Sequence, residues 1–212
     1  MTDKIDVPAK HWDRLFAPSS CLAMITTVDG GGVVNAASYG TCVRVAHEPV
    51  HVAFTTSPGK DTYNNILLNG EFVINLAPFD PLVLGQVRVV GLPFAPGVDE
   101  LAKAGLTALA ARVLRPPRIA ECPRHFECRV VWTREWIDRV MIVGEVVAAS
   151  VDADAIHPDG TVIWEKVRPA HYCGAPYNNQ FVAAFQTFSA DMPYDGPEVQ
   201  KFEDDRIAML KE

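Results

Sequence analysis

Apolar and polar residues alternate with a period of two in several short segments, and this period limits the folds the chain can adopt. The pattern covers residues 50–54, 72–76 and 126–132. Successive side chains of a β-strand point to opposite faces, so a period of two predicts strands with one buried face. Residues 140–147 are apolar except for Glu145, which indicates a central strand covered on both sides.

Residues 21–28 read as a further strand, followed by Asp29 and three consecutive glycines. Glycine adopts a positive φ at little steric cost, so this segment predicts a hairpin turn with the chain returning from Val33. Helical signals are fewer. The segments predicted to be helical are residues 10–16, 61–68, 81–90 and 99–105. Asp61 is the expected N-cap of the second, and Gly70 and Gly105 are expected helix stops. The pattern predicts an antiparallel barrel with helices packed outside.

Composition narrows the class of protein. Of 212 residues, 49% are hydrophobic, which is enough for a substantial core, and the net charge is −7. Nucleic-acid binding is not expected, because a basic footprint is missing. An apolar run long enough for a membrane helix (~18 residues) is also missing, and residues 1–6 are too polar for a signal peptide. We therefore expect a cytoplasmic protein.

The cysteines are expected to be buried thiols. Their number, five, is odd and no C-x-x-C pair occurs, which argues against a disulfide framework and a zinc site. The six histidines are expected at the surface or in satisfied hydrogen bonds. We predict no metal site and no compact catalytic constellation.

Residues 55–66 form the most informative segment. A strand ends, a Ser-Pro-Gly loop follows, and a helix begins near Asp61. A helix N-terminus presents unpaired N–H groups, and Ser57, Lys60 and Thr62 add hydroxyls and a positive charge. This predicts a phosphate-binding site that is not a Walker loop. The alternative is an ordinary capped helix with a solvated lysine.

A second segment, residues 33–41, combines small residues with polar side chains at the end of a strand. Small residues let a flat ligand approach the backbone. The alternative is a strand that ends in a polar turn.

Taken in order, these segments resemble the flavin reductase-like family, which has an FMN-binding split barrel. The matching segments are Thr26–Gly30, Asn35–Ser38, Glu48–Phe54, Lys60–Thr62 with Asn64–Ile66, Gly70–Leu76, Gly105–Leu106, Glu127–Cys128 and Val143–Val146. The resemblance covers roughly residues 17 to 177. No single segment is specific, but the ordered set is.

The resemblance implies a mainly β fold with peripheral helices, a six-stranded antiparallel split barrel that binds FMN, with FAD as the alternative. It divides the chain into a helical segment (residues 1–16), a barrel domain (17–180) and a tail (181–212). The implied flavin-contacting residues are Asn35, Ala36, Ala37, Ser38, Thr41, Thr55, Thr56, Ser57, Lys60, Asp61, Thr62 and Asn65. Within this set, Ser57, Lys60 and Thr62 match the phosphate-holding segment, Asp61 is assigned to capping and Asn65 to support of the turn.

One departure from the family bears on the electron donor. Many members carry Gly-Asp-His where this chain has Ile137-Asp138-Arg139, and that histidine is linked to nicotinamide binding. Arginine does not titrate near neutral pH, although it can clamp a phosphate or carboxylate. Asp138 and Arg139 are therefore candidate nicotinamide or substrate residues. The resemblance therefore predicts first a reductase that passes hydride from NADH or NADPH to flavin. The alternatives are a flavin-binding electron carrier and a flavin-free protein that binds another phosphorylated ligand.

The resemblance also implies a homodimer. Trp12, Phe16 and the C-terminal tail are candidates for its interface. A flavin-dependent monooxygenase or another electron acceptor is the expected partner.

Overall fold

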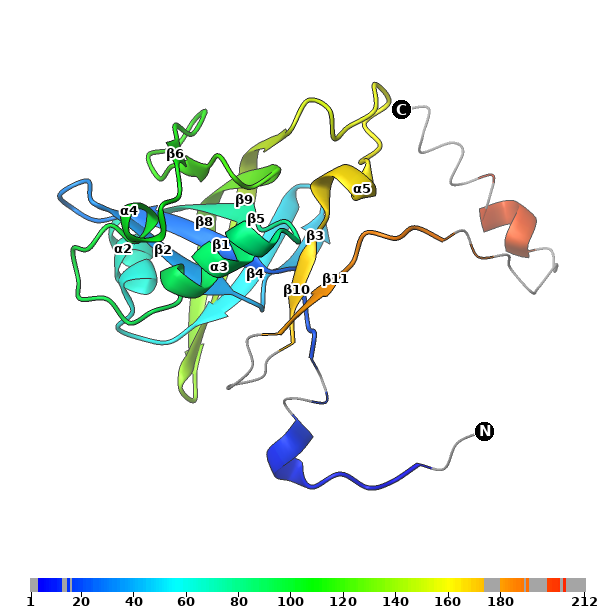
Figure 1. The fold of residues 1–212 in the computed structure, drawn as a ribbon, viewed down its shortest axis with the longest axis horizontal. Helices are drawn as coiled ribbons and strands as arrows, with labels where there is room; N and C mark the ends of the chain where they lie inside the picture. Colours follow the sequence, from blue (N-terminus) through cyan, green and yellow to red (C-terminus); the bar gives the residue numbers. More distant parts are fainter. Residues whose placement is uncertain are drawn as a thin grey trace.

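A seven-stranded antiparallel sheet forms the body of the protein, with strand order β2-β1-β5-β8-β9-β4-β3 (Figure 1). The structure is a computed structural model that describes residues 4–12, 15, 17–173, 180–188, 190, 198–202 and 204. The strands of the sheet are β1 (Ala23–Val28), β2 (Val34–Tyr39), β3 (Val43–His47), β4 (Val50–Thr56), β5 (Glu71–Leu76), β8 (Arg124–Trp136) and β9 (Arg139–Val151).

The sheet curls until its two edges approach each other, but it does not close. The Tyr39 ring on β2 lies 4.9 Å from the Phe54 ring on β4, between centroids, although these strands are far apart in strand order. The inner face holds a buried cluster that includes Ile25, Phe54 and Phe72. This arrangement confirms the split-barrel fold class. The sheet has seven strands instead of the six expected, because the chain returning from Val33 breaks after Tyr39 and resumes as the separate edge strand β3.

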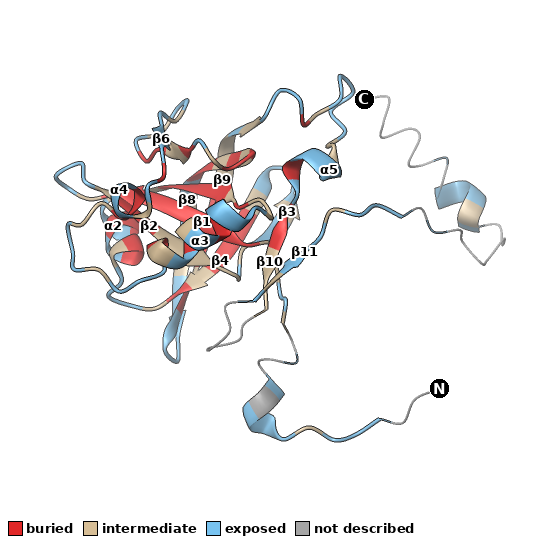
Figure 2. Cartoon of the chain, viewed as in Figure 1, coloured by how far each residue is buried: buried red, intermediate tan, exposed pale blue. Residues whose placement is uncertain are grey.

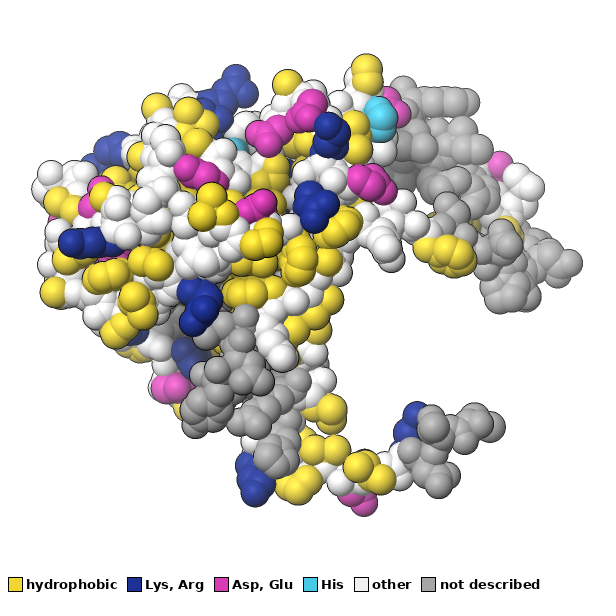
Figure 3. Space-filling model, viewed as in Figure 1, with side chains coloured by type: hydrophobic (Ala, Val, Ile, Leu, Met, Phe, Trp, Pro, Cys, Tyr) yellow, Lys and Arg dark blue, Asp and Glu magenta, His cyan; other side chains and the backbone are white. Residues whose placement is uncertain are grey.

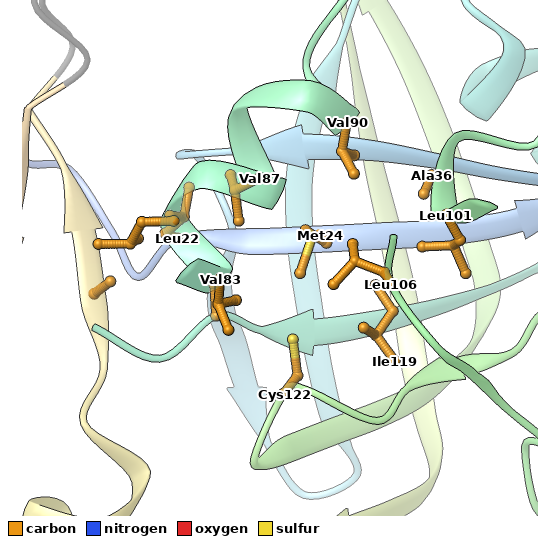
Figure 4. Close-up of a cluster of buried hydrophobic side chains, with 13 residues drawn as sticks. Leu22, Met24, Ala36, Val83, Val87, Val90, Leu101, Leu106, Ile119 and Cys122 are labelled. Carbon is orange, nitrogen blue, oxygen red and sulfur yellow. The ribbon is translucent and has the colours of Figure 1, made fainter. Parts of the chain in front are cut away.

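Helices cover the mouth and one outer face of the barrel. They are α2 (Asp61–Asn69), α3 (Pro81–Val90), α4 (Glu100–Ala104) and α5 (Trp164–Val167). Helix α2 adds Tyr63 and Ile66 to the inner cluster. Helices α3 and α4 bury a second cluster against β1 and β2, where Val83, Val87 and Leu101 surround Met24 (Figure 4). The predicted positions of α2, α3 and α4 are confirmed. Gly70 and Gly105 end α2 and α4 in the left-handed conformation, as expected.

The remaining elements are short. They are the 3-10 helix η1 (Ala9–His11) and the strands β6 (Ala108–Leu109), β7 (Arg118–Ile119), β10 (Ala170–Tyr172) and β11 (Phe181–Ala183). The predicted helix over residues 10–16 is described only in part, since residues 13, 14 and 16 lie outside the described residues. Strand β11 follows the expected domain boundary at residue 180 and pairs with β10 before it. Burial is concentrated in the sheet, whereas η1 and the chain after β11 are largely exposed (Figure 2).

Candidate functional site

A cavity of about 550 Å³ lies where the ends of β2 and β4 meet the N-terminus of α2. All of the predicted flavin-contacting residues except Ala36 and Asn65 line it, and so does Arg139. The volume falls within the range of small-molecule sites (about 300–1,000 Å³). Two segments singled out in the sequence therefore form one site. Whether these residues contact flavin stays a prediction.

The N-terminus of α2 opens into this cavity without a side-chain cap. Its first helical hydrogen bond runs from Asn64 N–H to Lys60 C=O (2.9 Å), so the preceding amides have no partner within the helix. Lys60 holds the N-cap position, and among the described residues no side chain caps the helix. The prediction that Asp61 is the N-cap was wrong, because Asp61 is the first helical residue. A free helix N-terminus is a site for an anionic group, so the geometry fits a phosphate.

Positive charge reaches this end of the cavity from two elements. Lys60 comes from the loop before α2, and Arg139 comes from the first residue of β9. Arg139 Nη1 donates to Ser57 Oγ at 3.0 Å, which joins the arginine to the predicted phosphate segment. Asp138 does not line the cavity, and its exposed carboxylate lies 3.9 Å from Arg139 Nε. Of the two candidate nicotinamide or substrate residues, Arg139 therefore lines the cavity and Asp138 lies beside it on the outside.

Buried amide and hydroxyl groups hold the floor of the cavity. Asn35 Nδ2 donates to the hydroxyls of Thr27 and Thr62, each at 3.1 Å. Asn65 Nδ2 donates to Thr27 Oγ1 at 3.0 Å, which places Asn65 behind the wall. The sequence assigned Asn65 to support of the turn, whereas this hydrogen bond joins Asn65 to β1. Ala36 also lies behind the wall, because its side chain belongs to the cluster under α3 and α4.

Hydroxyl groups of β2 and β4 line the opposite side. Thr55 N–H donates to Thr41 Oγ1 at 3.2 Å, and the oxygens of the Tyr39 and Thr56 hydroxyls lie 3.2 Å apart. Burial raises the pKa of the Tyr39 phenol, so this group stays protonated at neutral pH. The Tyr39–Thr56 contact joins β2, at one edge of the open sheet, to β4 near the other edge, beside the cavity.

Sequence reasoning missed the wall formed by α3, the loop after it and α4. The missed residues are Val90, Gly91, Leu92, Pro93, Phe94 and Glu100. An apolar run Leu92-Pro93-Phe94 directly after a helix is a signal that could have found part of it, since apolar loop residues need a surface to cover. Glu100 gave no such signal, because a glutamate in the first turn of a helix is ordinary.

Glu100 is buried, with 6% of its surface exposed, and its Oε2 accepts the Ala36 N–H at 2.9 Å. Burial is the main cause that raises the pKa of its carboxyl above 4.5. Folding therefore disfavours the ionised form of Glu100. As the pH falls toward the pKa that this carboxyl has in the unfolded state, the folded protein takes up the proton and its free energy of unfolding rises.

We expect the Glu100→Gln protein without ligand to be at least as stable as the wild type at pH 7.5. Glutamine keeps an acceptor for Ala36 N–H and removes the buried charge. The advantage should shrink as the pH falls toward 4.5 and vanish below it, because the wild-type carboxyl is then increasingly protonated in both the folded and the unfolded state. Urea unfolding at several pH values measures it. Glu100→Ala is the control: it leaves the amide unpaired and should lose about 1–3 kcal/mol. If the stability of Glu100→Gln relative to the wild type were lower at pH 7.5 than at pH 4.5, the inference that burial disfavours the ionised carboxyl would be wrong.

The open antiparallel barrel and the cavity at its rim define a protein of the split-barrel class. Residues 18–174 match the family described as "Flavin reductase like domain", and the chain belongs to this family. An uncharacterized protein of Aquifex aeolicus is 30% identical over 169 residues, which cover 77% of this chain and 84% of that protein.

Solved structures share the fold at lower identity. The 2-nitrobenzoate 2-nitroreductase of Pseudomonas fluorescens is 21% identical, with a TM-score of 0.78 over 92% of this chain and 98% of that chain. The flavoredoxin of Methanosarcina acetivorans is 23% identical, with a TM-score of 0.74 over 93% and 100%. At this identity the likeness establishes the fold alone.

Proposed function

We propose that the protein binds FMN in the cavity at the barrel rim and transfers hydride from NADH or NADPH to it. The observation that carries the proposal is the uncapped N-terminus of α2, with Lys60 on it and Arg139 close by in the same cavity. FAD is the alternative flavin. Membership of the flavin reductase-like family supports a flavin over other phosphorylated ligands.

The residues of the cavity suit the separate parts of a flavin. Ser57, Lys60, Thr62 and Arg139 would hold the phosphate. The small residues of β2 would lie against the ring, with the apolar residues 90–94 opposite them. When bound, the flavin would supply the hydride-accepting chemistry, and the chain would bind, orient and shield it. A general acid or base is not required for hydride transfer.

A flavin-binding electron carrier without nicotinamide activity is the second candidate. One contact favours it: Arg139 stands where many family members have the histidine linked to nicotinamide, and here it donates to Ser57 on the phosphate side. If Arg139 binds the phosphate, no side chain at this position takes the place of the histidine that is linked to nicotinamide binding.

Anaerobic addition of NADH, and separately of NADPH, to the FMN-loaded protein tests the two candidates. We expect the flavin absorption bands to bleach, because the donor reduces the bound ring. Chemical reduction with dithionite is the control that the flavin is redox-active. Bands that persist with both nicotinamides but bleach with dithionite would favour the carrier. A protein that binds no added FMN would exclude both and leave another phosphorylated ligand.

We also propose a homodimer that passes electrons to a flavin-dependent monooxygenase or another acceptor. Hydrophobic side chains gather over α3 and along β10 and β11 (Figure 3), and Leu82, Leu92 and Val182 among them are exposed. Trp12, an interface candidate, is also exposed, whereas Phe16 and most of the tail lie outside the described residues. A second copy of this chain would cover this face.

In the described part of the chain, no helix is long and apolar enough to cross a membrane. We place the protein in the cytoplasm.

A further inference from the structure

Three side chains with thiol and nitrogen chemistry meet where β10 joins the barrel, outside the flavin cavity. Cys21, just before β1, forms an antiparallel bridge with His171 of β10. Leu22 N–H donates to Ala170 C=O at 2.8 Å and fixes the register of this join. The Cys21 sulfur consequently lies 3.7 Å from Nε2 of His171, within hydrogen-bonding distance for sulfur.

Arg124, the first residue of β8, brings positive charge to the same place. Burial lowers the pKa of its guanidinium, and interaction with the Cys21 side chain opposes that effect. The guanidinium lies over the Trp164 ring, 5.4 Å from its centroid. Among the described residues no carboxylate forms a salt bridge with Arg124, and its buried Nε has no hydrogen-bond partner. A cation without a carboxylate partner stabilises a neighbouring thiolate.

We propose that Cys21 is an activated thiol, with His171 as its base and Arg124 as its counter-charge, and that hydrogen peroxide oxidises it to a sulfenic acid. The Cys21 thiol gives its proton to Nε2 of His171. The thiolate attacks one peroxide oxygen, so an S–O bond forms and the O–O bond breaks. The departing hydroxide takes the proton from the imidazolium and leaves as water. The sulfur loses two electrons and the peroxide gains them.

The other cysteines lack this environment. Cys122 and Cys128 are fully buried, and burial raises the pKa of both thiols. Burial likewise raises the pKa of Cys42 to about 12, with a smaller contribution from Cys21. At neutral pH Cys42 therefore stays a thiol and condenses slowly with an oxidised neighbour, so the sulfenic acid at Cys21 should persist. The described residues contain no group of three metal-ligating side chains, which separates this site from a metal centre.

Cys173 is the natural comparison inside the same molecule, because it is partly exposed like Cys21. Its backbone N–H donates to Gln180 C=O at 3.0 Å. Exposure alone should make the two thiols react alike, whereas activation by His171 and Arg124 should favour Cys21.

The test is treatment of the intact protein with substoichiometric hydrogen peroxide in the presence of dimedone, followed by peptide mass spectrometry. We expect Cys21 to be labelled at least about 10-fold faster than Cys173. His171→Asn should reduce the Cys21 rate by about 10-fold while leaving the Cys173 rate unchanged. Thermal unfolding of each variant checks that the fold is retained.

His51→Asn is the matched control, since His51 lies on β4 and pairs with Glu145 away from this cluster. It should leave the Cys21 rate unchanged. Equal labelling of Cys21 and Cys173 would overturn the proposal, and so would an unchanged Cys21 rate in a folded His171→Asn protein. If His171→Asn does not fold, the ratio of the two rates in the wild type decides alone. The proposal does not depend on flavin binding, because Cys21 and His171 do not line the flavin cavity.

Discussion

Replacing Lys60 and Thr62 together with alanine is expected to raise the dissociation constant for FMN by about 30- to 1,000-fold, or ~2–4 kcal/mol. Each lost contact to a phosphate, one of them charge-assisted, is worth roughly 1–2 kcal/mol. The uncapped end of α2 and Arg139 would remain, so binding should weaken without being abolished. Isothermal titration calorimetry with the apoprotein measures the change.

Riboflavin separates a lost phosphate contact from damage to the cavity. Thr62 is 1% exposed, and its Oγ1 accepts from Asn35 Nδ2, so its removal disturbs the floor as well. Asn35 keeps Thr27 as an acceptor, which limits that disturbance. Riboflavin has no phosphate, so its affinity should change little. Lys103→Ala, on exposed α4 surface outside the cavity, is the matched control. Equal weakening of FMN and riboflavin, or an unchanged FMN constant, would refute the phosphate assignment.

Local chemistry explains why much of the barrel could be predicted. The turn after β1 is held by Asp29, whose Oδ1 accepts the N–H groups of Gly31 and Val33 at 2.8 Å, and Gly32 takes a φ of +85°. Such a turn depends on adjacent residues only. The same holds for α3, where the side chain of Asp80 caps the N-terminus and Pro81 follows. The residues that determine this turn and this helix start are close together in the sequence, so both could be predicted from it.

The cavity depends on contacts that sequence order does not contain. Glu100 lies far along the chain from Ala36, yet its carboxylate accepts the Ala36 N–H. Tertiary packing also determines which side chains of β2 face the cavity and which face the core. The resemblance assigned the consecutive residues Asn35–Ser38 to the cavity, although neighbouring side chains of a strand point to opposite faces, and Ala36 lies in the core. The family resemblance gave the segment, while packing decided which of its residues face the ligand.

The approach of Phe72 to Gly144 predicts the largest loss of stability. Gly144 lies in the middle of β9, where a β-carbon would stand 2.6 Å from Cζ and 2.7 Å from Cε1 of the Phe72 ring. That ring is fully buried and packs edge-on against Phe54, 5.3 Å between centroids, so it has little room to move. A β-carbon would also meet the Arg129 carbonyl oxygen at 3.2 Å. We expect Gly144→Val to lower the free energy of unfolding by about 3 kcal/mol or more, since overpacking forces shifts of the backbone and neighbouring rings.

Urea unfolding followed by circular dichroism measures this loss, and Gly85→Ala is the matched control. Gly85 lies inside α3, where a β-carbon would meet nothing within 4 Å. Alanine there should raise the free energy of unfolding by about 0.5–1 kcal/mol, because glycine weakens a helix interior. A lower free energy of unfolding for the Gly144 variant and a higher one for the Gly85 variant would show that packing inside the barrel causes the loss, and not the removal of a glycine as such. If Gly144→Val does not fold, Gly144→Ala should still lose about 1–3 kcal/mol. A Gly144→Val protein as stable as the wild type would mean that Phe72 can leave the β9 backbone, and the close packing inferred for the barrel interior would be wrong.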